Sequence, residues 1–146
     1  QRYGRVSWER VVSGMGIGNI YEFLAAWHRT EHPPAVADAL AGDGDVPAAV
    51  AQCAAEAVHP CTEAMDLFGL LYGREAGNTA LKLLALGGVY LGGGIAPKQL
   101  ALLRAGGFLK GFLDKGRMRG LMERMPVRVI LSQDVPLLGA ARFVGG

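Results

Sequence analysis

The chain has 146 residues, of which 51% are hydrophobic and 19% charged, which is enough apolar material for one compact domain and too little charge for a disordered chain. The formal net charge of +2 is too weak to indicate nucleic acid or an anionic membrane as a partner. The two cysteines, Cys53 and Cys61, make no disulfide framework and favour a reducing, cytoplasmic setting. Because the first residue is Gln1 rather than Met, we interpret the start as a cut boundary.

Local signals in the first part of the chain predict short helices. Ser7 suits the N-cap of a helix over 8–12, and the helical spacing of apolar residues then predicts a second helix. The residues on its expected buried face are Ile17, Ile20, Tyr21, Leu24, Trp27 and His28. The Pro-Pro pair at 33–34 should end that helix. The alanine-rich segment 35–58 predicts two more short helices, with a turn at 42–45.

The longest predicted helix covers residues 60–85. It contains Gly69, Gly73 and Gly77, which recur every fourth residue and therefore share one face. Each glycine costs a helix about 1 kcal/mol relative to alanine, so three on one face predict that another backbone packs closely there. Paired membrane helices use the same spacing, but charged residues inside this helix argue against lipid. The most apolar segment, 83–97, is also too short to span a membrane.

The second half of the chain predicts strands as well as helices. Residues 88–91 are a short apolar run bounded by glycines, typical of a buried strand, and residues 127–131 predict a second strand. The glycines at 92–94 and the following Pro97 predict a tight turn into a helix. Further helices are expected at 98–105, 108–114 and 136–143. With no internal repeat, residues 1–146 are expected to form one α/β domain in which helices predominate.

Two glycine-rich motifs are candidates for a functional site. The first covers residues 8–18 and contains Glu9, Ser13 and Gly14. From the pattern alone, Glu9 is a solvated acid that stabilises the dipole of its helix. No strand precedes these glycines, so they are not a dinucleotide fingerprint. The second motif, 87–97, indicates either a simple strand-to-helix turn or a place where a ligand approaches free N–H groups. It lacks the Gly-Lys-Ser/Thr of a Walker loop.

Both motifs resemble segments of the bacterial glucokinase family. The first is similar to the family's glutamate-bearing run, in which a short helix ends in Ser-Gly and a second helix begins; hexokinases have a related run. The second resembles the adenosine motif that sugar kinases share with actin and the heat-shock ATPases. Further similar segments follow in the expected order at 77–81, 114–118 and 137–141. The resemblance therefore spans nearly the whole chain, and 35–58 is its least distinctive part.

The resemblance implies roles for individual residues and a fold. Glu9 would accept hydrogen bonds from sugar hydroxyls, for which an ionised carboxylate is well suited. Ser13 and Gly14 would line the nucleotide cleft. The residues expected to pack against adenosine are Gly93, Gly94 and Ile95. The implied fold is the helix-rich α/β C-terminal large domain of the actin-like ATPases, which are ribonuclease H-like.

The implied reaction transfers the γ-phosphoryl group of ATP, with Mg²⁺, to the 6-hydroxyl of glucose. The base aspartate, the phosphate-binding turn and a Glu-x-Gly-His segment are expected upstream of Gln1. We therefore expect no catalytic residue and no metal ligand in this chain, and no turnover by this piece alone. The family also implies a homodimer. Two alternatives stay open: a kinase for another hexose or an aminosugar, and a non-catalytic module that responds to sugar or nucleotide.

Other signals favour ordinary structural roles. Residues 28–32 fit the His-x-x-Glu-His pattern of some zinc peptidases, but the prolines at 33–34 end the supporting helix and no third ligand is evident. The His-Pro-Cys run at 59–61 lacks the spacing of a metal-binding pair and is interpreted as a helix start. A group of basic residues interrupted by acids is interpreted as a solvated surface. Its members are Lys110, Lys115, Arg117, Arg119 and Arg124.

Overall fold

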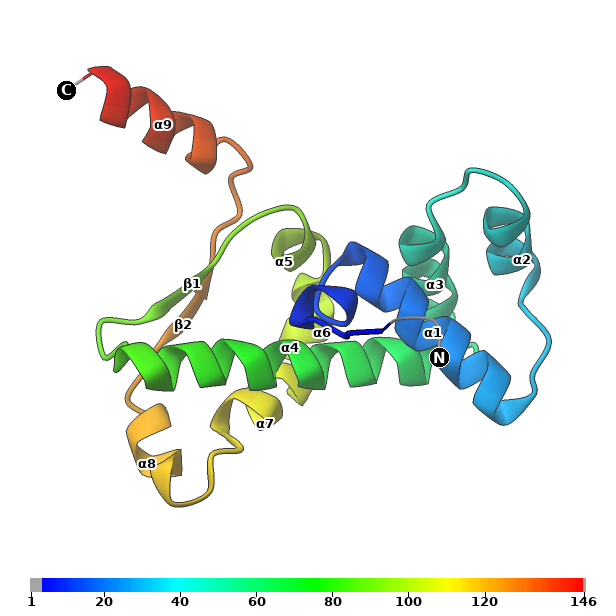
Figure 1. The fold of residues 1–146 in the computed structure, drawn as a ribbon, viewed down its shortest axis with the longest axis horizontal. Helices are drawn as coiled ribbons and strands as arrows, with labels where there is room; N and C mark the ends of the chain where they lie inside the picture. The colour runs from blue at the N-terminus through cyan, green and yellow to red at the C-terminus, as the bar shows by residue number, and fades with distance from the viewer. Residues whose placement is uncertain (1–3, 146) are drawn as a thin grey trace.

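The computed structural model describes residues 4–145 and consists mainly of helices around one long central helix, with a small sheet beside it (Figure 1). The elements of the first half are η1 (Trp8–Arg10), α1 (Gly14–His28), α2 (Pro34–Ala41), α3 (Val46–Ala55) and α4 (Cys61–Leu83). The elements of the second half are β1 (Val89–Leu91), α5 (Ile95–Lys98), α6 (Leu100–Arg104), α7 (Gly107–Leu113), η2 (Gly116–Met118), α8 (Arg119–Met122), β2 (Val127–Val129) and α9 (Val135–Gly145). The predicted helix-rich α/β class is confirmed.

The residues that begin and end the first helices differ from those predicted from the sequence. Ser7 stands before η1, but its side chain makes no capping hydrogen bond, so the predicted cap is wrong. The capping serine is Ser13, whose Oγ accepts the N–H of Gly16 at the start of α1. At its other end, α1 stops at Arg29, which adopts a left-handed φ of 54°. The helix therefore ends before the prolines, and Pro34 instead opens α2.

The predicted buried face of α1 is correct over its first turns and wrong at its end. Ile17, Ile20, Tyr21 and Leu24 are buried. Trp27 is 72% exposed, and its ring stacks on that of the exposed Phe23, with 6.1 Å between centroids. His28 also lies at the surface. Both residues fall in the last turn of α1, after the final core contacts of the helix at Leu24 and its neighbour.

The glycine face of α4 is used for close backbone packing, as predicted, at two of its three positions. A Cβ on Gly73 would overlap the backbone of α7, and one on Gly77 would lie 2.6 Å from the carbonyl oxygen of Phe112 in the same helix. Gly69 differs, because a Cβ there would meet only the side chain of Leu102, at 3.4 Å. The prediction is therefore confirmed for Gly73 and Gly77 and wrong for Gly69.

The two strands pair in parallel, with Val89 opposite Val127 and Leu91 opposite Val129. The chain crosses between them through α5 to α8. The predicted helix over 98–105 is interrupted, because Gln99 has a non-helical φ of −104° and ψ of 26° that separates α5 from α6.

Two hydrophobic clusters share α4. The first packs α1, α2 and α3 against the start of α4, and the second packs the end of α4 against α7, α8 and the sheet. The largest fully buried side chains include Tyr21 and Phe68 in the first cluster and Phe112 in the second. Burying a phenylalanine side chain stabilises a fold by about 1.5–3 kcal/mol. Because α4 contributes residues to both clusters, it supports both halves of the structure.

Helix α9, predicted at 136–143, extends away from the rest of the structure (Figure 1). Leu137 and Phe143 on it are exposed. None of the helices within residues 4–145 combines the length and the apolarity that crossing a membrane requires.

Candidate functional site

One pocket joins three distant parts of the chain. It has a volume of about 380 Å³ and lies between the N-terminal ends of α1, α3 and α5. Its lining includes Gly14 and Ile17 of α1, Asp45 and Ala48 of α3, and Gly94, Ile95 and Lys98 around the start of α5. Helix N-termini direct N–H groups and a partial positive charge toward a ligand. Two of the N–H groups at these helix starts, those of Gly16 and Ala48, are already bonded to the side chains of Ser13 and Asp45, so an acceptor group of a ligand would have to use others.

Ser13 holds η1 and α1 together beside this pocket. Its Oγ donates to the backbone oxygen of Glu9 at 2.6 Å and accepts the N–H of Gly16 at 3.0 Å. The side-chain amide of Asn19 adds a bond of 2.8 Å to the backbone oxygen of Arg10. Since the single hydroxyl proton of Ser13 is already donated, one lone pair is left for a ligand.

The close contact between η1 and α1 also depends on Gly16. A Cβ at this position would lie 2.9 Å from the Cα of Val11 and closer still to the carbonyl group of that residue. The glycine is therefore required by packing, and the junction that carries Glu9 is rigidly placed.

Glu9 is exposed on η1. Among residues 4–145, no hydrogen bond or ion pair reaches its carboxylate. It does not line the pocket at Gly14 and Gly94. The carboxylate is thus an open acceptor on a turn that Ser13 fixes to the start of α1, next to the pocket.

The second motif reaches the pocket through only part of its length. Gly94 and Ile95 line it, and Ile95 also packs against the first hydrophobic cluster. Gly93 has a φ of +89°, a conformation that glycine adopts freely. The structure therefore brings Gly14, Gly94 and Ile95 together, while Ser13 and Gly93 are their chain neighbours outside the lining.

The charges of the pocket come from two residues. Lys98 supplies a cation, and Asp45 supplies the single carboxylate of the described lining. The Oδ1 atom of Asp45 accepts the N–H of Ala48 at 3.1 Å and so caps α3.

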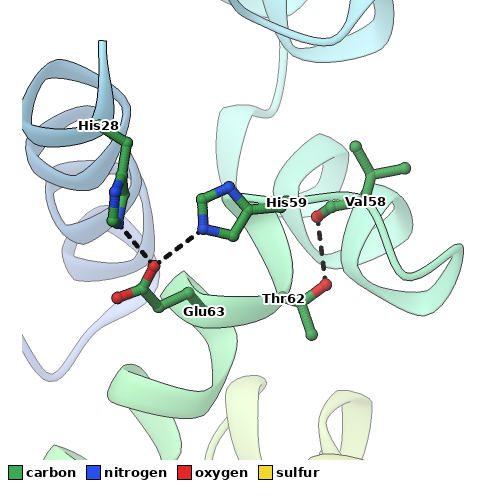
Figure 2. Close-up of polar contacts among 5 residues, drawn as sticks. All are labelled: His28, Val58, His59, Thr62 and Glu63. Atoms are coloured by element: carbon green, nitrogen blue, oxygen red, sulfur yellow. Dashed lines mark hydrogen bonds and ion pairs between the residues drawn. The ribbon is translucent and has the colours of Figure 1, made fainter. Parts of the chain in front are cut away.

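A second polar cluster, which the sequence did not predict, lies at the other end of α1. His28 and His59 both bond to the carboxylate of Glu63 (Figure 2). His32 bonds to the hydroxyl of Tyr21 instead, at 2.9 Å. The His-x-x-Glu-His pattern at 28–32 is therefore divided between two different contacts. The available sequence signal was the spacing of four residues between His59 and Glu63, and nothing local connects either residue to His28.

Arg119 and Lys115, two members of the basic group, bond to acceptors within the protein. Arg119 pairs with Glu123 at 2.9 Å, and Lys115 donates to the backbone oxygen of Arg74 at 3.1 Å. Arg74 itself pairs with Asp114 at 3.0 Å. Burial lowers the pKa of Lys115. The solvated surface expected from the sequence is found for Lys110, Arg117, Arg119 and Arg124, which are exposed, but not for the half-buried Lys115.

The glucokinase family model matches residues 1–145. The chain belongs to the glucokinase family. It is 47% identical to the glucokinase of Synechocystis sp. over 155 residues, which cover 94% of this chain and 42% of that relative. It is also 47% identical to the glucokinase of Nostoc punctiforme over 148 residues, covering 94% of this chain and 43% of the relative. The resemblance inferred from the motifs is confirmed.

The fold agrees with the family. A crystal structure of glucokinase from an Antarctic psychrotroph matches with a TM-score of 0.79 and 30% sequence identity, over 99% of this chain and 42% of that one. The chain thus spans 42–43% of the length of these glucokinases.

Proposed function

We propose that this chain is the C-terminal large domain of an ATP-dependent glucokinase with the actin-like ATPase fold. The enzyme would transfer the γ-phosphoryl group of ATP to the 6-hydroxyl of glucose. The observation that carries the proposal is the pocket in which Gly14 meets Gly94 and Ile95, in a chain that matches the glucokinase family from residue 1 to 145. These are the residues to which the family resemblance gives a nucleotide role.

The adenosine moiety would lie against the turn before α5. A Cβ on Gly93 or Gly94 would meet no atom within 4 Å, so the surface above these glycines is open to a ligand. Ile95 offers an apolar contact to the base, and the N-terminal end of α1 faces it from across the pocket. Ser13 keeps one lone pair for a donor of the nucleotide.

Glucose would be held by Glu9. Its open carboxylate accepts hydrogen bonds from two hydroxyls, and charge-assisted bonds are the stronger kind. Because Ser13 joins the turn of Glu9 to α1, the sugar and nucleotide ends are fixed relative to each other. Phosphoryl transfer depends on such in-line positioning.

Mg²⁺ is expected to accompany the nucleotide, but this pocket offers little to hold it. The carboxylate of Asp45 is already used to cap α3, and Mg²⁺ in kinases is bound largely by phosphates and by a few carboxylates. Ligands for the ion would therefore come mainly from the nucleotide phosphates. The general base and the phosphate-binding turn belong to the part of the enzyme outside it. We also propose that the enzyme is a homodimer, as the family resemblance implies. We place it in the cytoplasm, because the two buried cysteines are free thiols.

The sugar role is tested in the full-length protein by Glu9→Gln, with Glu56→Gln as the matched change of another exposed acid. Losing a charged hydrogen-bond partner costs about 1.5–3 kcal/mol, or roughly 10- to 100-fold in kcat/KM for glucose. A coupled assay with a panel of hexoses and aminosugars gives the preferred substrate. Wild-type kinetics in Glu9→Gln would remove this residue from the site, and preference for another sugar would change the substrate.

The nucleotide role is tested by Gly94→Ala. Gly94 has a φ of −76°, which alanine adopts without strain, so a methyl group would enter the pocket and raise KM for ATP before KM for glucose. Gly93→Val should act in the same direction, but its positive φ adds backbone strain. If both variants lost thermal stability alone, the motif would be a simple turn. Turnover by the isolated 146-residue chain would contradict the proposed division of the site.

A further inference from the structure

Three side chains from separate segments meet on the surface at the C-terminal end of α1. His28 is the last residue of α1, His59 precedes α4, and Glu63 is in the first turn of α4 (Figure 2). The Nε2 atom of His28 lies 2.8 Å from Oε2 of Glu63, and Nε2 of His59 lies 3.0 Å from the same oxygen. The two imidazole rings meet edge to face, with 4.8 Å between their centroids.

The spacing of these groups suits a small cation. One donor atom from each residue can be chosen so that all three lie within 4.8 Å of one another. In a tetrahedral zinc site the ligand atoms are about 3.3 Å apart, as bonds of about 2.0–2.1 Å require. The two contacts to Glu63, at 2.8 and 3.0 Å, are already near that value, so small rotations of the side chains would admit the ion. The side chains of His28, His59 and Glu63 are 33%, 53% and 45% exposed, which leaves them room to rotate.

The backbone beneath the cluster is fixed by the core. Cys61 and Ala64, on either side of Glu63, are fully buried. Leu24 and Ala25, one turn before His28, are buried as well. The donor positions are therefore set by the packing of α1 against α4, while the donor groups themselves face solvent.

The turn that carries His59 is held by a neighbour. The backbone N–H and the side-chain hydroxyl of Thr62 both donate to the backbone oxygen of Val58, at 3.1 Å each, and Figure 2 shows the hydroxyl contact. Residues that hold a ligand-bearing segment in place reduce the cost of ordering it when a metal binds.

The chemistry of the donors selects the class of metal. Two imidazoles and one carboxylate are the donors of many zinc sites, in which water completes the coordination. An ionised carboxylate such as that of Glu63 offers only acceptor oxygens and can bind a cation directly. With neutral imidazoles the cluster carries a negative charge, which attracts a cation.

We propose that His28, His59 and Glu63 form a site for one divalent transition-metal ion of the zinc class, which joins the end of α1 to the start of α4. The site is separate from the pocket at the other end of α1, and it does not depend on the glucokinase proposal. Its ligand set is not the pattern at 28–32, because it uses only His28 from that run. Bound metal would hold α1, whose first residues line the pocket, against α4.

The test is a titration of the full-length, chelator-treated protein with Zn²⁺, in the absence of nucleotide, followed by calorimetry. The variants are His28→Gln, His59→Gln and Glu63→Gln, and the matched control is Glu31→Gln, the exposed acid of the linear pattern. We expect binding of one ion per chain to this site. Changes in groups that only support a metal ligand weaken binding by roughly 10- to 100-fold, so each ligand variant should lose at least that much. Glu31→Gln should bind as the wild type does.

A second readout is the melting temperature, which Zn²⁺ should raise in the wild type and in Glu31→Gln but not in the ligand variants. Circular dichroism verifies that each variant is folded. If a histidine variant loses helix, the isosteric Glu63→Gln shows whether metal binding depends on this cluster. Absence of saturable binding would refute the site, as would unchanged affinity in the three variants. An equal loss in Glu31→Gln would assign the metal to the linear pattern instead.

Discussion

The close packing of α4 on α7 can be tested with a single methyl group, by the substitution Gly73→Ala. A Cβ at Gly73 would overlap the carbonyl group of Phe108 and lie 3.0 Å from its Cα. These are backbone atoms of a packed helix, so no rotamer change removes the overlap. Helix α7 must move away from α4 to admit the methyl group.

The expected change in the free energy of unfolding for Gly73→Ala follows from two opposing effects. Overpacking a core typically costs about 1–3 kcal/mol, occasionally more. Moving α7 would also displace Phe108 and Phe112, which are only 2% and 1% exposed, so we take the upper end of that range. Alanine stabilises a helix by about 1 kcal/mol relative to glycine. The expected net loss for Gly73→Ala is therefore about 2 kcal/mol.

Gly69 provides the matched control on the same face of α4. Its added Cβ would meet carbons of Leu102 at 3.4–3.6 Å, which is ordinary contact with a flexible side chain. The gain in helix propensity should dominate, so Gly69→Ala should be neutral or more stable by up to about 1 kcal/mol.

Urea unfolding of the two variants and the wild type measures this difference. We expect the midpoint of Gly73→Ala to fall and that of Gly69→Ala to stay or rise, with the slope m unchanged in both. The reasoning would be refuted by a wild-type midpoint in Gly73→Ala, or by an equal loss in Gly69→Ala.

Three further outcomes are expected. Ser13→Ala removes the cap of α1 and should lower the free energy of unfolding by about 1 kcal/mol; an unchanged thermal melt would contradict the capping role. Burial raises the pKa of Cys61 to about 11, so this thiol should resist a thiol reagent at neutral pH until the protein unfolds, and rapid labelling of the native protein would be the opposite result. Asp114→Asn breaks an exposed ion pair with Arg74 and should change stability by less than about 1 kcal/mol, whereas a larger loss in a urea titration would show that the pair supports the fold.

Much of the local structure could be predicted because its causes lie within a few residues. The long helix expected at 60–85 is found at Cys61–Leu83, and the strand expected at 88–91 is found at Val89–Leu91. Helical spacing identified the buried side of α1 as far as Leu24. The prediction for Trp27 failed because periodicity shows which face a residue is on, not where the neighbouring helices end.

Family motifs extended the prediction to the site but not to its geometry. The sequence singled out Gly14 and Gly94, and the structure adds that both line one pocket. The sequence also singled out Ser13, whose hydroxyl turned out to be engaged by Glu9 and Gly16. Propensity and spacing describe groups a few residues apart, whereas Gly14 and Gly94 line one pocket from distant parts of the chain.

By itself, the sequence determined the long helices α1 and α4, the two strands, the close backbone packing at Gly73 and Gly77, and the family. Only the tertiary structure decided which distant groups meet. From the sequence, His28 was set aside as a metal ligand because the prolines at 33–34 end its helix and no third ligand is evident, and His59 because the 59–61 run lacks the spacing of a metal-binding pair. His59 reaches Glu63 from four residues away, but only the packing of α1 against α4 brings His28 to the same carboxylate. Such convergence depends on the angle and distance at which two helices pack, and those are fixed by side chains spread over the whole core.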